Sequence, residues 1–194
     1  GLNSAKTRYC KEEAFYVFYK NLPANAVISL TDGAGNFYTN RDSVQILYST
    51  PGTYVIKIRV FSCGLVEDSL VVTIDSSITP ICTATTPVCQ QTEVVFSNAT
   101  PQQYLAAMAF DFGDGSFSNN YNASHFYSPG VYSVQVITTT FNGCKDTLEI
   151  PIQVFENPIA NFSADINTSC YPELITYTSH SSDTLLHEWL FGNG

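Results

Sequence analysis

Six cysteines and three histidines are the side chains of this 194-residue sequence that could hold a metal or form covalent bonds. A zinc site needs cysteines or histidines at short spacing. The sequence contains no C-x-x-C and no histidine at ligand spacing from a cysteine. Disulfide bonds are therefore the better interpretation, and they predict an oxidising, extracellular compartment.

The sequence contains no pattern of an enzyme active site. His180 and His187 are seven residues apart with Glu188 beside the second, which is not the H-E-x-x-H of zinc proteases. The sequence has no G-x-S-x-G, no Cys, His and Asn set in catalytic context, and no two carboxylates expected to face each other across a cleft. We predict that the chain is not an enzyme.

Asp111 and Asp114 are the weak candidates for calcium ligands. They flank a turn, with Asn119 and Asn120 nearby, and hard oxygen ligands suit Ca²⁺. The alternative, which we favour, is that both carboxylates accept hydrogen bonds from turn amides. No other cofactor is expected.

Composition excludes several partners. Charged residues make up only 13% of the chain and the formal net charge is −9, so binding to nucleic acid or to an anionic membrane is not expected. No run of 18 apolar residues exists, so membrane insertion is not expected either. The apolar stretch Ala14–Tyr19 is predicted to be a buried strand. No signal peptide precedes Gly1, which predicts a mature or excised piece.

Two segments of the sequence recur at one period of about eighty residues. Residues 49–58 recur as 127–136, residues 110–115 recur as 189–194, and Cys10, Cys89 and Cys170 follow at similar steps. We predict modules at 1–77 and 78–156 and the N-terminal half of a third at 157–194. The short polar joints between them predict a semi-rigid rod.

Each module is predicted to be a sandwich of short strands. Tyr132, Val134 and Val136 alternate with Ser133 and Gln135, the period of a strand with one buried face. The expected strands of the second module are 92–98, 105–112, 131–140 and 146–154, with a hairpin turn at 141–143. Such strands at hairpin spacing predict an all-β fold of tandem immunoglobulin-like antiparallel β-sandwiches.

Recurring cysteine positions predict one disulfide within each module. Cys10 and Cys63 are 53 residues apart, and Cys89 and Cys144 are 55 apart. We therefore expect the bonds Cys10–Cys63 and Cys89–Cys144, with the partner of Cys170 beyond Gly194. Cys82 is either a small buried hydrophobe or a partner for Cys89.

The second module resembles the PKD domain. F-D-F-G-D-G at 110–115 and H-F-Y-S-P-G-V-Y at 125–132 are similar to the family's W-D-F-G-D-G and H-x-Y-x-x-P-G-x-Y. W-L-F-G-N-G at 189–194 is similar too, whereas the first module has L-T-D-G at 30–33 and is a divergent member or a related sandwich. The resemblance implies an extracellular binding or spacer module without catalytic residues, in which His125 bonds the neighbouring turn.

Tandem modules of this kind with recurring cysteines resemble the giant cell-surface adhesins of Bacteroidetes. The resemblance implies type 9 secretion cargo, including gliding-motility adhesins, attached to the bacterial outer membrane. Expected partners are other repeats of the same chain, the outer-membrane secretion or motility machinery, and an unidentified surface glycan or protein. Alternatives are an accessory, glycan-binding module of a secreted hydrolase and a subunit held in a secretion or motility complex.

The same resemblance leads to an O-glycosylation hypothesis. Bacteroidetes modify exported proteins at Asp followed by Ser or Thr and then a small or apolar residue. This pattern occurs four times, with hydroxyl acceptors at Ser43, Ser69, Thr147 and Thr184. The alternative is that Asp-Ser/Thr pairs open strands and cap local amides.

Overall fold

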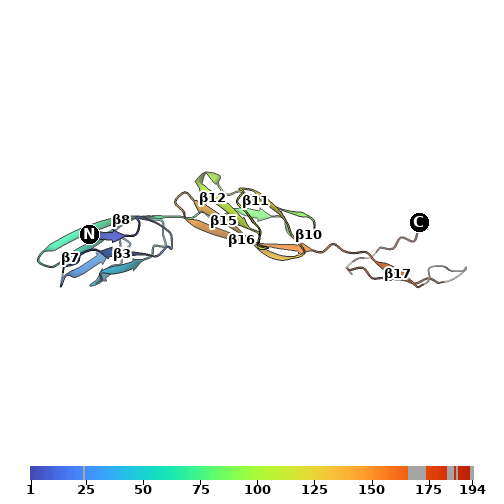
Figure 1. Ribbon diagram of the computed structural model, residues 1–194, viewed down its shortest axis with the longest axis horizontal. Coiled ribbons are helices and arrows are strands. Elements are labelled where there is room, and N and C mark those ends of the chain that lie inside the picture. Colours follow the sequence, from blue (N-terminus) through green and yellow to red (C-terminus); the bar gives the residue numbers. More distant parts are fainter. Residues whose placement is uncertain (24, 166–173, 183–185, 187, 193–194) are drawn as a thin grey trace.

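The computed structural model describes residues 1–194 except 24, 166–173, 183–185, 187 and 193–194. The described part is built from strands, with one short 3-10 helix, η1 (Gln102–Tyr104). Two β-sandwiches and a small strand pair follow one another along the long axis of the molecule (Figure 1). The predicted all-β, immunoglobulin-like fold is confirmed. Among the described residues, no helix has the length and hydrophobicity needed to cross a membrane.

The first sandwich contains one three-stranded and one five-stranded sheet. The small sheet has the order β1-β3-β6 and the large sheet has the order β2-β8-β7-β4-β5. The strands are β1 (Leu2–Ser4), β2 (Arg8–Cys10), β3 (Phe15–Tyr19), β4 (Val27–Thr31), β5 (Phe37–Thr39), β6 (Ser43–Ile46), β7 (Gly52–Phe61) and β8 (Leu65–Asp75).

The second sandwich repeats this topology strand by strand. Its sheets have the orders β14-β11-β9 and β10-β16-β15-β12-β13. The strands are β9 (Cys82–Ala84), β10 (Val88–Cys89), β11 (Glu93–Asn98), β12 (Leu105–Asp111), β13 (Phe117–Ser118), β14 (Ala123–Phe126), β15 (Gly130–Thr140) and β16 (Lys145–Phe155). In both sandwiches the second strand pairs in parallel with the end of the last strand, as β2 with β8 and β10 with β16.

Each sandwich has its own hydrophobic core between its two sheets. The predicted alternation is confirmed, because Val134 and Val136 on β15 are fully buried. The stretch 14–19 contains the predicted strand, β3, which is buried on one face only. Phe15 and Val17 face the core whereas Tyr16 between them is 60% exposed, since only one face of a sandwich sheet is covered.

After the second sandwich, β17 (Phe162–Ala164) pairs antiparallel with β18 (Tyr177–Ser179). Cys170, Thr184 and His187 lie outside the described residues. The module limits at 77/78 and 156/157 stay predictions.

Candidate functional site

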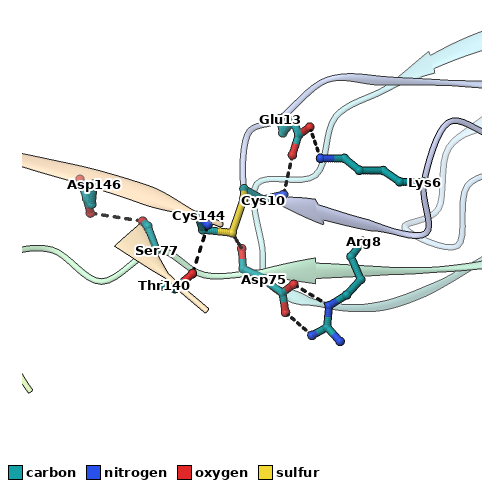
Figure 2. The surroundings of a disulfide bond; sticks show 9 residues. All are labelled: Lys6, Arg8, Cys10, Glu13, Asp75, Ser77, Thr140, Cys144 and Asp146. Carbon is teal, nitrogen blue, oxygen red and sulfur yellow. Dashed lines mark hydrogen bonds and ion pairs between the residues drawn. A yellow bond between two sulfur atoms is a disulfide. The ribbon is translucent and has the colours of Figure 1, made fainter. Parts of the chain in front are cut away.

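A disulfide bond joins the two sandwiches. Cys10 at the end of β2 is bonded to Cys144, which lies in the turn between β15 and β16, with their Cα atoms 5.5 Å apart. Six residues, 76–81, connect β8 to β9 beside this bond, and we call them and the strand ends around them the first joint. Figure 2 shows the disulfide between the two sandwiches, with Asp75 beside it. Two covalent connections therefore cross the first joint, the main chain and the disulfide.

The predicted bonds Cys10–Cys63 and Cys89–Cys144 are wrong. Cys10 pairs in register with Asp75 at the end of β8, whereas Cys63 precedes the start of that strand. Because β8 has 11 residues, the two cysteines are separated by roughly 30 Å along the sandwich. The sequence repeat correctly indicated that the cysteines occupy equivalent positions in the two modules. It did not reveal that the two cysteines of one module lie at opposite ends of its sandwich.

The other described cysteines are unpaired. Cys63 and Cys89 are exposed and Cys82 is buried. Cys82 packs into the core of the second sandwich, and burial raises the pKa of its thiol. Of the two alternatives for Cys82, the structure has the small buried hydrophobe.

Hydrogen bonds also cross the first joint. Thr79 Oγ1 donates to Asp146 Oδ2 at 2.6 Å and Ser77 Oγ donates to the same atom at 3.2 Å. The bond from Thr79 lowers the pKa of Asp146, with Lys11 of the first sandwich adding a favourable charge. Thr138 Oγ1, which is fully buried, donates to the carbonyl oxygen of Ile78. The polypeptide between the sandwiches is thus fixed to the second sandwich.

The last strand of the first sandwich is fixed at the joint as well. Arg8 donates from Nε and Nη2 to the two carboxylate oxygens of Asp75, at 2.9 and 2.8 Å. This bidentate pair, shown in Figure 2, lowers the pKa of Asp75. None of these joint residues was singled out for this role from the sequence. Cysteines at opposite ends of two consecutive modules were the signal that could have located the joint.

The end of β12 and the turn that follows it carry the two carboxylates considered as calcium ligands, Asp111 and Asp114. Asp111 Oδ1 accepts from the Gly113 amide at 3.0 Å, and Asp114 Oδ1 accepts from the Ser116 amide at 3.0 Å. Both carboxylates therefore bond turn amides, as the favoured alternative expects. Calcium binding stays untested. Among the described residues, no group of three or more His, Cys, Asp or Glu side chains is placed to hold a metal ion.

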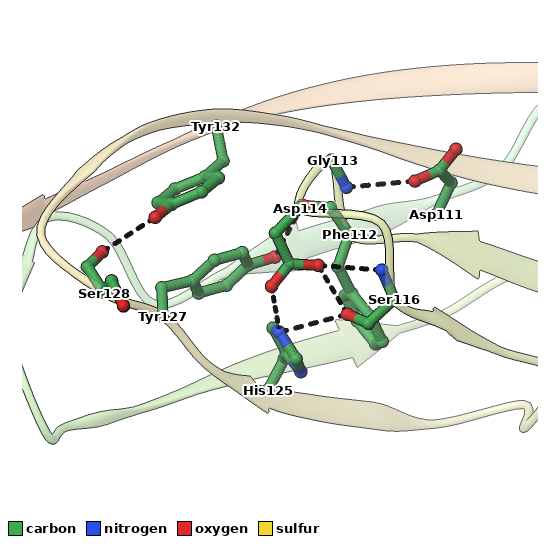
Figure 3. Close-up of polar contacts among 9 residues, drawn as sticks. All are labelled: Asp111, Phe112, Gly113, Asp114, Ser116, His125, Tyr127, Ser128 and Tyr132. Atoms are coloured by element: carbon green, nitrogen blue, oxygen red, sulfur yellow. Dashed lines mark hydrogen bonds and ion pairs between the residues drawn. The ribbon is translucent and has the colours of Figure 1, made fainter.

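His125 bonds this turn, as the resemblance implied. Its Nε2 lies 2.7 Å from Asp114 Oδ2 and 3.2 Å from Ser116 Oγ, and its ring stacks on Phe112 (Figure 3). Burial alone raises the pKa of Asp114, but the bonds from Ser116 and His125 outweigh it and lower that pKa to about 2. A serine–histidine–aspartate triad needs serine and aspartate on opposite ring nitrogens. Here both contact Nε2, so the arrangement supports the turn and does not activate the serine.

Two tyrosines bond backbone carbonyl groups at and near this turn. Tyr127 donates its hydroxyl to the Phe112 carbonyl oxygen at 3.2 Å, and Tyr132 donates to that of Ser128 at 3.0 Å (Figure 3). In the first sandwich Tyr48 donates to the Asp32 carbonyl oxygen and Tyr54 donates to that of Thr50. Burial raises the pKa of both Tyr48 and Tyr127.

The candidate glycosylation sites lie on exposed strand positions. Ser43 on β6, Ser69 on β8 and Thr147 on β16 are all exposed. Each hydroxyl is therefore accessible in the described part of the chain, and glycosylation stays a prediction. His180 is bonded to Ser163, at 2.9 Å from Nε2 to Oγ.

Comparison with known protein families identifies one part of the chain. Residues 78–154 match the family model of the PKD domain. No curated protein matches the chain. Similar solved structures include fibronectin(III)-like modules of CbhA from Clostridium thermocellum (13% identity, 80% of this chain, 95% of that chain, TM-score 0.42). Another is a C-terminal 282-residue fragment of intimin in complex with the intimin-binding domain of the translocated intimin receptor (13%, 86%, 66%, 0.47).

The chain is a tandem of immunoglobulin-like β-sandwiches. The second sandwich is the part that matches the PKD domain. The PKD domain is typically a non-catalytic module.

Proposed function

We propose that this chain is a non-catalytic repeat segment of an extracellular adhesin, in which the sandwiches act as stalk and interaction modules. The observation that carries the proposal is the first joint. An adhesin stalk must keep its modules in line and must transmit tension from one module to the next. The disulfide of the first joint can transmit tension, and its fixed connecting residues can keep the two sandwiches in line.

The disulfide changes the path of tension through the chain. A force applied to the two ends passes from Cys10 through the sulfur atoms to Cys144, which is 134 residues further along the sequence. The residues between them carry no net extension while the bond is intact. Those residues include most of both sandwiches, so the closed loop shields the greater part of each core from the load. Only β1 and β2, up to Cys10, and β16, after Cys144, remain in the path of the force.

The hydrogen bonds of the first joint limit bending. Asp146 accepts hydrogen bonds from two residues of the connection, Ser77 and Thr79. The buried Thr138 hydroxyl donates a further hydrogen bond to the carbonyl oxygen of Ile78. A short connection with several fixed points leaves few orientations for the second sandwich. This supports a rod in preference to loosely tethered domains.

The finer proposal is a cell-surface adhesin of Bacteroidetes that is exported by type 9 secretion, attached to the outer membrane and used in adhesion or gliding motility. It is supported by the repeated PKD-like sequence and by the disulfide, which belongs to oxidising compartments. Antibody labelling of intact source cells tests it: labelling that is lost when type 9 secretion is disabled supports the proposal. Recovery of the chain only as part of a soluble secreted hydrolase contradicts it.

Single-molecule pulling tests the stalk role. The 194-residue chain is pulled between marker domains under oxidising conditions and is compared with the C10S/C144S variant. Releasing 134 residues at about 3.5 Å each adds roughly 470 Å of extension in the variant. C63S is the matched control and should behave as the oxidised parent. Full extension of the oxidised parent would contradict a force-bearing disulfide.

A further inference from the structure

Cys89 occupies the same place in the second sandwich that Cys10 occupies in the first. Cys10 pairs with Asp75 at the end of β8, and Cys89 pairs with Phe155 at the end of β16, in parallel register in both cases. The residue after each cysteine donates its amide to the carbonyl oxygen of that partner, at 2.9 Å from Lys11 and 2.7 Å from Gln90.

The backbone beyond the two cysteines is also the same. Glu12 and Gln91, two positions after each cysteine, have positive φ of 63° and 65°. The third residue then donates its amide back to the carbonyl oxygen of the cysteine, from Glu13 in the first sandwich and Thr92 in the second. Both cysteines are therefore followed by the same backbone turn, which includes a positive φ that non-glycine residues rarely adopt.

The connections that follow the two sandwiches have equal length. Six residues, 76–81, lie between β8 and β9, and six residues, 156–161, lie between β16 and β17. We call the second set, with the strand ends around it, the second joint. Figure 1 places β10, which ends at Cys89, at the end of the second sandwich that faces β17. Cys89 therefore stands at the second joint as Cys10 stands at the first.

Cys63 is the counterpart of Cys144 at the other end of the array. It lies at the tip of the hairpin between β7 and β8, as Cys144 lies in the hairpin between β15 and β16. Cys144 faces the preceding sandwich, so the β7–β8 hairpin points toward the side on which a preceding sandwich would lie. Cys63 and Cys89 are both exposed, whereas the bonded Cys144 is 1% exposed.

We propose that Cys89 and Cys63 are half-sites for further disulfides of the same kind as Cys10–Cys144. Cys89 bonds a cysteine in the β15–β16-type hairpin of the immunoglobulin-like module that follows the second joint. Cys63 bonds the β10-type cysteine of a module that precedes the first sandwich. The bonds then run from each module to the next, so that consecutive disulfide loops overlap along the rod.

Bond formation requires an oxidant. The two thiols each lose a proton, one S–S bond forms, and two electrons pass to a disulfide oxidant such as oxidised glutathione, which is reduced to two thiols. Exposure of Cys63 and Cys89 gives both the oxidant and the partner cysteine access.

Insertion of a second copy of residues 76–155 between Phe155 and Glu156 of the full chain tests the Cys89 site. The inserted copy carries K145R, so that chymotryptic peptides of its hairpin, which begin after Phe141, differ in mass from those of the original. After oxidation with a glutathione mixture and digestion without reduction, we expect Cys89 of the original copy to be linked to Cys144 of the inserted copy, with Cys10–Cys144 kept. The matched variant C89S in the original copy should leave the inserted hairpin thiol free.

A second insertion tests Cys63 independently. Residues 82–161 are placed directly before Leu2, which gives the added sandwich the six-residue connection of the second joint. We expect Cys89 of the added sandwich to be linked to Cys63. In both proteins a cooperative thermal melt confirms folding. Bonds within a single sandwich, or free thiols at Cys89 and Cys63 in folded protein after oxidation, would overturn the proposal.

Discussion

The two sandwiches build the same turn with different side chains. Gly33 and Gly113 both have φ of 78°, and a Cβ on either would approach the carbonyl oxygen of the neighbouring strand, to 2.8 Å from Val55 and 2.6 Å from Ser133. The residue before each glycine is buried, but it is Asp32 in the first sandwich and Phe112 in the second.

The difference concerns how the turn is filled. Phe112 packs against aromatic neighbours, and Asp114 and His125 bond each other outside it. Asp32 instead accepts three hydrogen bonds, from the amides of Ala34 and Asn36 and from the Asn36 side chain. The backbone geometry is therefore what the two modules share, and the recognisable sequence motif is one of two ways to support it. This explains why the family match is confined to residues 78–154.

The largest expected effect comes from what the sandwiches share, the disulfide. With the first sandwich folded, unfolding of the second leaves a closed loop between Asp75 and Cys144, which are 69 residues apart. Closing a loop of that size stabilises the folded state by roughly 4 kcal/mol. We expect C10S/C144S to destabilise both sandwiches, measured by hydrogen-exchange mass spectrometry on peptides from β3 and from β11. Loss of protection in only one sandwich would show that the joint does not couple them.

A glycine pair tests the shared backbone. We expect G113A to destabilise the second sandwich by about 3 kcal/mol, because the added Cβ is strained at positive φ and meets the Ser133 carbonyl oxygen. G115A is the matched control, since its φ is +92° but nothing lies within 4 Å of the new Cβ, and it should cost about 1 kcal/mol. Denaturant unfolding measures both. Equal costs would mean that the close approach to β15 is unimportant.

The two polar networks should differ in sensitivity. D32N removes the charge from a carboxylate that is 1% exposed and accepts three hydrogen bonds, and we expect a loss of about 2 kcal/mol. D114N acts on a partly exposed side chain, so we expect about 1 kcal/mol. Chemical denaturation of each variant gives the two values. A larger loss for D114N would reverse the comparison.

The smallest effect is a pH dependence of the second sandwich. The pKa of Asp114 is lowered to about 2 in the folded protein, from 3.8. A carboxyl group with a lowered pKa contributes its stability above the unfolded value, and that stability is lost as the pH falls from about 4 to about 2. Melting curves over this range should show a smaller decline in D114N than in the parent. Parallel declines would exclude Asp114 as a source of acid sensitivity.

Much of the fold was predictable because its signals are local. The alternation of Val134 and Val136 with polar residues fixes which face of β15 is buried, and the glycines at 113 and 115 mark the turn. His125 was placed correctly because it occupies a position of the family motif, and the turn that it bonds lies 9 to 11 residues before it in the sequence.

The joint was not predictable in the same way. The pairing of Cys10 with Cys144 depends on which end of each sandwich carries each cysteine, and spacing within one module does not contain that information. Asp32 was missed as a buried network residue because a lone aspartate before a glycine is typical of an exposed turn. The first error concerns two cysteines that are distant in the sequence. The second concerns a turn whose supporting residue differs between the two modules.

The most direct test of the account is a peptide map of the 194-residue chain digested without reduction. The account predicts one linked pair that contains Cys10 and Cys144, with Cys63, Cys82 and Cys89 recovered as free thiols. Linked peptides containing Cys10 with Cys63, or Cys89 with Cys144, would contradict it.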